Sequence, residues 1–202
     1  AIHMHLSGGH DPPMPSIALP HVLPCVLMRA GTSRGPFFLR DWLPEGDEAR
    51  DQALIGAIGA SDPLQLDGLG GGSTLTSKVA IVSRSTQPDC DVDYLFAQVG
   101  VGDKSVDTRP NCGNMLSGVA PFAIEQGLIT AQDGHTTVRI HNVNTGSQIE
   151  ATVCTPGGKV SYSEVELSET TAPQPRPARL ATVHYIPRGG KTPEDNCKQF
   201  AP

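Results

Sequence analysis

The sequence lacks any apolar run near the roughly 18 to 20 residues that span a bilayer, so we expect no transmembrane segment. A block of basic residues is also missing. The 15 lysines and arginines are outnumbered by 21 aspartates and glutamates, which gives a formal net charge of −6. This charge argues against nucleic acid or an anionic membrane as the main partner. The expected partner is therefore a small molecule.

A cysteine pattern typical of a disulfide framework or a zinc site is missing too. The five cysteines are odd in number and irregularly spaced, with no CxxC pair and no nearby histidine set: Cys25, Cys90, Cys112, Cys154 and Cys197. The chain does not open with a charged segment, an apolar segment and a cleavage site, so no secretion signal is expected. These absences favour a reducing, cytoplasmic location.

Proline separates a structured middle from two flanks. Twelve of the 18 prolines fall within residues 1–24 and 156–202. We therefore predict a disordered leader at 1–21, one folded domain at 22–165 and a proline-rich tail at 166–202. The 202 residues are enough to bury one sizeable core.

The folded stretch is predicted to be α+β, rich in strands and with two helices. Early charges and later apolar residues predict a helix at 47–58. A second predicted helix, 113–127, is apolar on nearly every face and requires burial all round. We therefore expect a β-barrel-like, curled sheet wrapped around this helix, with Pro121 kinking it or marking an early turn. The predicted strands are 23–28, 37–39, 78–84, 94–99, 136–142, 148–153 and 159–162.

Cys112 is the first candidate for chemistry, because it opens the apolar helix. A thiol at a helix N-terminus feels the positive end of the helix dipole, which raises its thiolate fraction. The free amides of Gly113, Asn114 and Met115 are suited to a substrate carboxylate. The alternative is a buried, unreactive thiol with Asn111 as a helix cap.

Lys78 is the second candidate, where a loop rich in Gly, Ser and Thr enters an apolar strand. Partial desolvation there favours the neutral amine and makes the side chain a usable proton carrier. The segment is not a phosphate-binding P-loop, because Ser77 and not Gly precedes the lysine. The alternative is an ordinary lysine that reaches into water from a strand start.

Other polar groups are weaker candidates. The turn at residues 28–35 offers hydroxyls, amides and arginines that could clamp carboxylates, although surface turns have similar composition. His135 and His141 share an even spacing but have no third ligand, so we expect structural or surface roles and no metal site. No Ser/His/Asp set is recognisable.

Four segments together resemble the PrpF protein family over residues 22–165: RAGTSRGPFFL, DGLGGGSTLTSKVAIV, DVDYLFAQV and NCGNMLSGVAPFAIEQGL. The resemblance implies a fold like that of diaminopimelate epimerase, with two pseudo-symmetric halves that each wrap a curled sheet around a helix. Members of the family are cofactor-independent isomerases of small di- and tricarboxylates, including 4-oxalomesaconate, methylitaconate and aconitate. The motifs look most like those of members acting on 4-oxalomesaconate.

The resemblance also implies roles for individual residues. The family's catalytic lysine and cysteine match Lys78 and Cys112, which implies a 1,3-proton transfer in which one group removes a proton and the other returns one. Which of the two is the base stays open. The other matched positions would line a carboxylate pocket: Gly31, Thr32, Ser33, Ser73, Thr74, Asn111, Gly113, Asn114 and Met115.

The chain departs from the family in two ways. Arg34 replaces the usual lysine, which exchanges a point charge for a planar fork. Family members are also longer, and their second-half motifs are missing here. The sequence therefore leaves three readings open: a tautomerase acting on 4-oxalomesaconate, a methylitaconate or aconitate isomerase, or a non-catalytic domain that binds carboxylates or self-associates as a homo-oligomer.

Overall fold

The computed structural model describes residues 23–162 and 182–184. The predicted leader at 1–21 lies outside the described residues, as does the tail at 166–202 apart from one short strand. The elements in chain order are β1 (Val26–Ala30), β2 (Ser33–Leu39), η1 (Arg40–Trp42), α1 (Asp47–Ile58), β3 (Lys78–Arg84), β4 (Val92–Val99), β5 (Val106–Asp107), α2 (Gly113–Leu116), α3 (Val119–Glu125), β6 (Gly134–Asn142), β7 (Ser147–Thr155), η2 (Pro156–Gly158) and β8 (Thr182–His184).

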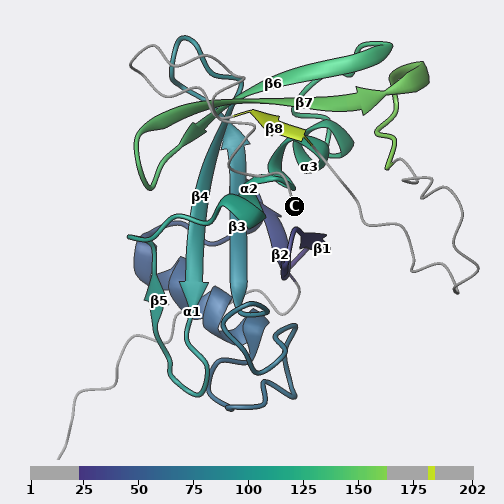
Figure 1. The fold of residues 1–202 in the computed structure, drawn as a ribbon. Coiled ribbons are helices and arrows are strands. Elements are labelled where there is room, and N and C mark those ends of the chain that lie inside the picture. The colour runs from purple at the N-terminus through teal and green to yellow at the C-terminus, as the bar shows by residue number, and fades with distance from the viewer. Residues whose placement is uncertain (1–22, 163–181, 185–202) are drawn as a thin grey trace, which may run out of the picture.

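The described strands form one sheet in the order β1-β2-β3-β4-β6-β7-β8, with β5 paired to β4 beside this path. β1 and β2 form an antiparallel hairpin, β2 pairs in parallel with β3, and β3 pairs antiparallel with β4. β6 and β7 form a second hairpin that crosses one end of β3 and β4 (Figure 1). A three-residue parallel ladder, Val92–Tyr94 against Ile140–Asn142, joins β4 to β6. The sheet therefore consists of two parts that meet at a short junction.

Both faces of the central strands are buried. Side chains alternate across a strand, so neighbouring residues belong to different layers. Phe38, Val79 and Ile81 share a buried cluster with Leu54 and Ile58 of α1. A larger cluster on the other face brings sheet residues together with α2 and α3, and includes Phe37, Ala80, Phe96, Met115 and Phe122. The predicted α+β class, with a curled sheet around an apolar helical segment, is confirmed.

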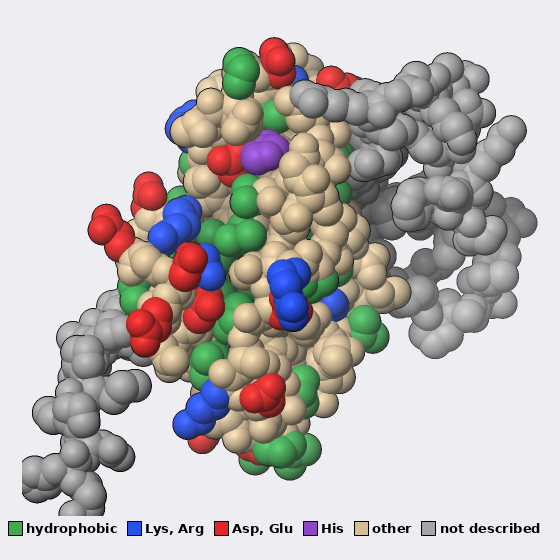
Figure 2. Space-filling view, turned by 90° about the vertical axis from the view of Figure 1, so that its left-hand side faces the viewer, with side chains coloured by type: hydrophobic (Ala, Val, Ile, Leu, Met, Phe, Trp, Pro, Cys, Tyr) green, Lys and Arg blue, Asp and Glu red, His purple; other side chains and the backbone are tan. Residues whose placement is uncertain are grey.

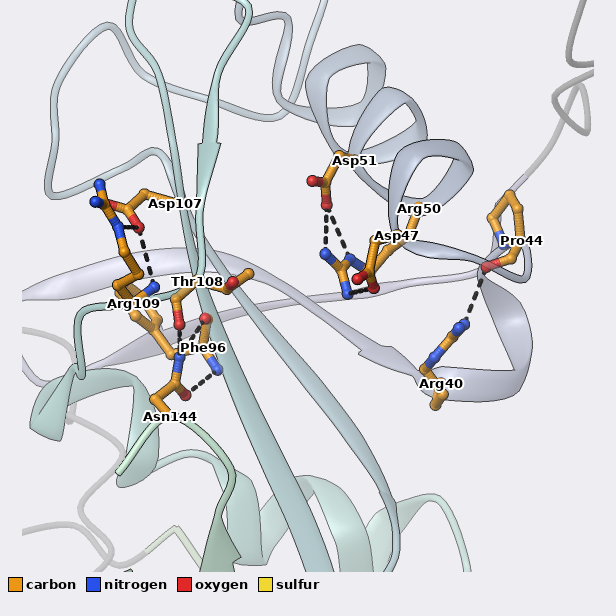
Figure 3. Close-up of polar contacts among 10 residues, drawn as sticks. All are labelled: Arg40, Pro44, Asp47, Arg50, Asp51, Phe96, Asp107, Thr108, Arg109 and Asn144. Carbon is orange, nitrogen blue, oxygen red and sulfur yellow. Dashed lines mark hydrogen bonds and ion pairs between the residues drawn. The ribbon is translucent and has the colours of Figure 1, made fainter. Parts of the chain in front are cut away.

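Helix α1 is confirmed over the predicted residues 47–58. Gly59 ends it in the left-handed conformation, with φ 77°, which glycine adopts without a steric penalty. Arg50 is buried on this helix, and its guanidinium lies 2.7 Å from one carboxylate oxygen of Asp47 and 2.7 Å from one of Asp51 (Figure 3). Two carboxylates thus compensate the cost of burying one charge.

The prediction of one continuous helix at 113–127 is wrong. The segment forms two helices, α2 and α3, separated by Ser117 and Gly118. A Cβ on Gly118 would lie 2.6 Å from Phe37 Cζ, so glycine lets the break pack against β2. Pro121 lies in the first turn of α3, where its missing N–H costs nothing. The predicted burial is confirmed for α3, since residues 119–124 are all buried.

Three other elements differ from the prediction. Residues 159–162 form no strand: Gly157 and Gly158, with positive φ values of 63° and 72°, make a tight turn after β7, and a hydrogen bond returns from the Ser161 N–H to the Cys154 carbonyl at 2.9 Å. β5 and β8 were not predicted. Each is short, and β8 pairs antiparallel with Glu150–Thr152 of β7.

No helix among the described residues combines the length and apolarity needed to cross a membrane. The face shown in Figure 2 carries acidic and basic side chains intermixed, with small apolar areas between them. This distribution agrees with the absence of a basic block in the sequence.

Candidate active site

Lys78 begins β3 on the face of the sheet that carries α2. Its Nζ donates a hydrogen bond to Gln98 Oε1 at 2.8 Å and lies 5.0 Å from the centre of the Phe96 ring. The side chain is half-buried. Two neighbours on β4 therefore orient the Lys78 side chain.

The backbone brings α2 directly over the start of β3. Gly35 of β2 lies between them, because a Cβ there would overlap the Lys78 carbonyl and lie 3.3 Å from Met115 Cε. Only glycine allows this approach. The helix that follows Cys112 is thus packed against the strand that begins with Lys78, and both predicted catalytic groups lie on the same face of the sheet.

Cys112 immediately precedes α2 and is 9% exposed. Its N–H donates to Asn111 Oδ1 at 2.7 Å, and its carbonyl accepts from the Leu116 N–H at 3.1 Å and from Tyr94 Oη at 3.2 Å. Burial raises the pKa of Tyr94 well above its usual range, with a smaller contribution from Cys112, so the phenol stays protonated and keeps donating. The backbone of Cys112 is therefore fixed on both sides.

The start of α2 retains the predicted free amides, although the helix is a single turn. Its first intrahelical bond runs from the Leu116 N–H to the Cys112 carbonyl, so the N–H groups of Gly113, Asn114 and Met115 precede the ladder. A Cβ on Gly113 would meet nothing within 4 Å. Gly113 and Asn114 are exposed, so an anion has room to approach this end of the helix, whereas Met115 is completely buried. Because α2 contains only four residues, few peptide dipoles add up along it, and the predicted helix-dipole effect on Cys112 is reduced to that of these local amides.

A chain of asparagines supports the loop that carries Cys112. Asn142 is fully buried at the end of β6 and donates from Nδ2 to Asn111 Oδ1 at 2.8 Å. Its own Oδ1 accepts from the Asn144 N–H at 3.1 Å. Asn144 Oδ1 accepts a hydrogen bond from the Phe96 N–H at 2.8 Å (Figure 3). Asn144 Nδ2 donates to the Phe96 carbonyl at 2.9 Å and to the Thr108 carbonyl at 2.6 Å. The sequence analysis missed this network, whose signal is the asparagine-rich turn after the 136–142 strand.

The turn between β1 and β2 lies against the start of α2. Asn114 Nδ2 donates to Thr32 Oγ1 at 2.8 Å, and a Cβ on Gly31 would lie 2.5 Å from Asn114 Oδ1. Gly31, Thr32 and Asn114 are exposed, whereas Ser33 is completely buried. Among the described residues, Ser33 Oγ and Arg34 Nε are the buried side-chain atoms without a hydrogen-bond partner.

The glycine-rich loop places Ser73 and Thr74 beside Lys78 through Gln98. Gln98 Nε2 donates to the carbonyls of Thr74 and Ser77, at 3.3 and 2.9 Å. Ser73 accepts at its carbonyl from Ser77 Oγ at 2.7 Å. Both Ser73 and Thr74 are exposed.

Gln65, which was also not predicted from the sequence, fixes the glycine-rich loop through hydrogen bonds of its side chain. It is 1% exposed and has φ 54°. Its Oε1 accepts from the Gly72 N–H at 2.9 Å, and its Nε2 donates to Ser77 Oγ at 2.8 Å and to the Gly100 carbonyl at 3.2 Å. A glutamine before a glycine run gives no distinctive signal in sequence, since only the folded loop reveals its partners.

Some predicted site residues therefore lie at the start of α2, whereas Ser73 and Thr74 are placed by Gln98 and Ser77 near Lys78. Ser33 and Met115 are completely buried, so neither residue is exposed to a ligand in this structure. His141 lies outside the site, where its Nδ1 is 3.0 Å from Asp93 Oδ1 at the junction of β4 and β6. Within the described part of the chain, no group of three or more His, Cys, Asp or Glu side chains could hold a metal ion.

A cavity of about 540 Å³ lies elsewhere, on the face of the sheet covered by α1. None of the predicted site residues lines it. Its walls combine the start of the described chain, α1 and the 66–69 loop: Leu23, Cys25, Phe38, Ala53, Gly56, Ala57, Leu66, Asp67, Gly68 and Leu69. Lys78 and Cys112 lie on the opposite face of the sheet.

Comparison with known proteins identifies relatives over most of this chain. The family model described as PrpF protein matches residues 21–179. The chain is 61% identical over 140 residues to YbhH of Escherichia coli (strain K12). This alignment covers 69% of this chain and 40% of YbhH. It is 51% identical over 141 residues to 4-oxalomesaconate tautomerase of Pseudomonas putida (strain KT2440), covering 70% and 39% respectively. The chain thus spans about 40% of the length of these curated relatives.

A solved structure agrees with the fold. The crystal structure of a methylitaconate-delta-isomerase is 46% identical to this chain, with a TM-score of 0.69. The match covers 72% of this chain and 65% of that one. The helices and curled sheet described above are therefore shared with a protein of known structure.

Proposed function

Because the chain belongs to the PrpF protein family, we propose that it carries the proton-transfer site of a cofactor-independent isomerase of the 4-oxalomesaconate tautomerase type. The reaction is a 1,3-proton transfer in a small unsaturated di- or tricarboxylate. The observation that carries the proposal is the placement of Lys78 and Cys112 on one face of the sheet, with α2 packed over the start of β3. The named activity of the tautomerase relative supports the substrate class.

During the transfer one side chain gains a proton and the other loses one, so the total number of protons on the pair is unchanged. One removes a proton from a carbon or oxygen made acidic by a neighbouring carbonyl or carboxylate, and the other delivers a proton to the far end of the conjugated system. Each must then return to its starting state by exchange with solvent. Cys112 at 9% exposure and the half-buried Lys78 are both restricted in motion, which keeps the donor and the acceptor in fixed directions.

The backbone amides of Gly113, Asn114 and Met115 are proposed to hold a substrate carboxylate and to stabilise the enolate charge that develops. Gly31, Thr32, Ser73, Thr74 and Asn111 surround this position with exposed polar groups. Ser33 is assigned to the pocket with them, and its unpaired Oγ is the group that a small movement of the turn would offer to substrate. All of these groups are suited to a polyanionic small molecule.

We place this activity in a reducing cytoplasm, since the described cysteines Cys25, Cys90, Cys112 and Cys154 are all free thiols. Two alternatives remain for the substrate: methylitaconate, supported by the solved relative, and aconitate. A different class of function is a non-catalytic domain that binds carboxylates or self-associates. The short span of the chain relative to its relatives supports it.

A spectrophotometric assay of the 202-residue chain with 4-oxalomesaconate, methylitaconate and aconitate distinguishes these readings. We expect turnover of 4-oxalomesaconate that falls by at least about 100-fold in Cys112→Ser, because removing an acid–base group costs roughly 10² to 10⁴ in rate. Cys154→Ser is the matched control, since Cys154 is exposed on β7 and outside the site. Turnover in Cys112→Ser equal to wild type would refute the role of Cys112. A folded chain that binds carboxylates by calorimetry but turns over none would support the binding domain.

A further inference from the structure

Two contacts hold Lys78 Nζ within the described part of the chain, and both come from β4. Gln98 Oε1 accepts its hydrogen bond at 2.8 Å, and the Phe96 ring lies 5.0 Å away. Lys78 and Gln98 are directly opposite each other in the β3–β4 ladder, and Phe96 is two residues from Gln98 on the same face. The contact is therefore set by strand register.

The orientation of the Gln98 amide is fixed independently of Lys78. Its Nε2 donates to the carbonyl oxygens of Ser77, Thr74 and Val99, at 2.9, 3.3 and 3.3 Å. A flipped amide would turn its oxygen toward these carbonyls, which are acceptors only. The carbonyl oxygen of Gln98 is therefore the atom that must face Lys78.

The charged and titratable groups around this contact come from every neighbouring element. Cys112 precedes α2, and Arg34 lies on β2. Tyr94 lies on the same face of β4 as Phe96 and Gln98. Asp107 of β5 is opposite Gln98 in the β4–β5 ladder. Asp107 is already engaged by Arg109, whose Nε and Nη2 donate to its two oxygens at 2.8 and 2.9 Å. Within the described residues no carboxylate forms an ion pair with Lys78.

We propose that Gln98 is a positioning residue for Lys78, an inference that rests on the proposed function. It holds Nζ on the α2 face and gives it a neutral acceptor. A neutral acceptor accepts a hydrogen bond from the ammonium and from the amine, so it orients Lys78 in both states of the transfer. A carboxylate at the same position would instead retain the proton on Lys78.

The test measures the titration of Lys78 directly, so it does not depend on turnover. The chain has five lysines, and the NMR signal of the Lys78 side chain with ¹³C at Cε is assigned by its absence in Lys78→Arg. Gln98→Glu adds a charge beside Nζ, and Gln98→Met removes the acceptor at similar volume. Gln52→Glu is the matched control, because Gln52 is exposed on α1 and adds the same charge far from the site.

We expect the Lys78 titration midpoint to move to higher pH by at least about one unit in Gln98→Glu, a tenfold change in the ratio of ammonium to amine. In Gln98→Met it should move to lower pH, because the ammonium loses its acceptor. Gln52→Glu should leave it unchanged. Opposite shifts cannot arise from a loosened loop, which would expose Lys78 to water in both variants alike.

Two results would overturn the inference: no shift in either Gln98 variant, or shifts of the same sign in both. If Gln98→Glu does not fold, Gln98→Met alone decides, since a midpoint equal to or above that of wild type contradicts the proposal. The outcomes are separate from those of the proposed function. Opposite shifts in a chain that isomerises none of the carboxylates would refute the proposed activity and support the positioning role of Gln98. Turnover without any shift would support the activity and refute the positioning role.

Discussion

At the scale of single residues, the site depends on positions where a side chain is absent. Gly35 lets Met115 and the Lys78 backbone approach each other, and Gly31 combines φ 57° with close contact to Asn114. Left-handed backbone costs an L-residue roughly 1–2 kcal/mol, so Gly31 satisfies two requirements at once. Packing around α2 thus accounts for these two glycines of the predicted motifs.

Gly31→Ala should separate these two requirements. The variant is expected to lose roughly 1–2 kcal/mol of unfolding free energy from the backbone alone, and a further amount of about 1 kcal/mol because its Cβ would lie 2.5 Å from Asn114 Oδ1. Gly127→Ala is the control, since Gly127 has φ 72° and open space around its Cβ position. Chemical denaturation of both variants measures the difference. Equal losses would show that the Asn114 contact carries no energy.

At the scale of elements, the sequence predicted those segments whose pattern is local. Helix α1 and strand β3 have the predicted bounds, because charge placement and apolar runs suffice to define them. The break between α2 and α3 was not predictable in this way, since it depends on contact between Gly118 and Phe37, which is distant in sequence. Gln98 was missed for the same reason. Its role follows from ladder register, which requires knowing which strands pair.

The junction of β4 and β6 should weaken in acid. Arg139 donates from its side chain to both oxygens of Asp91, at 3.1 and 2.7 Å, and from its N–H at 2.8 Å, and these bonds hold the pKa of Asp91 below its usual range. A depressed folded-state pKa gives stability that is complete above the unfolded value of about 3.9 and is lost as pH falls through the folded value.

Asp91→Asn is therefore expected to lower the free energy of unfolding near neutral pH by up to about 1 kcal/mol, since the pair is partly exposed. The difference from wild type should shrink as pH falls below about 4. Denaturant unfolding across pH measures it, with the exposed Asp41→Asn as control. A difference that stays constant down to about pH 2 would mean that the ionised carboxylate contributes nothing at this junction.

At the scale of the whole molecule, two core clusters separate the proposed proton-transfer pair from the cavity. The face covered by α1 holds the cavity, whereas the face covered by α2 holds Lys78 and Cys112. The motifs of the sequence predicted Lys78 and Cys112, but the supporting contacts of Gln98, Asn142 and Gln65 required the fold. The chain spans about 40% of its curated relatives, so its ability to act alone is the central question.

Deuterium incorporation from D₂O into 4-oxalomesaconate, followed by ¹H NMR, tests the central claim most directly. It detects removal and return of a proton even when net turnover is slow. The account predicts exchange above the protein-free rate with wild type and Cys154→Ser, and a loss of at least about 100-fold in Lys78→Ala and Cys112→Ser. A folded wild-type chain that exchanges no faster than buffer, or a Cys112→Ser variant that exchanges as fast as wild type, would contradict it.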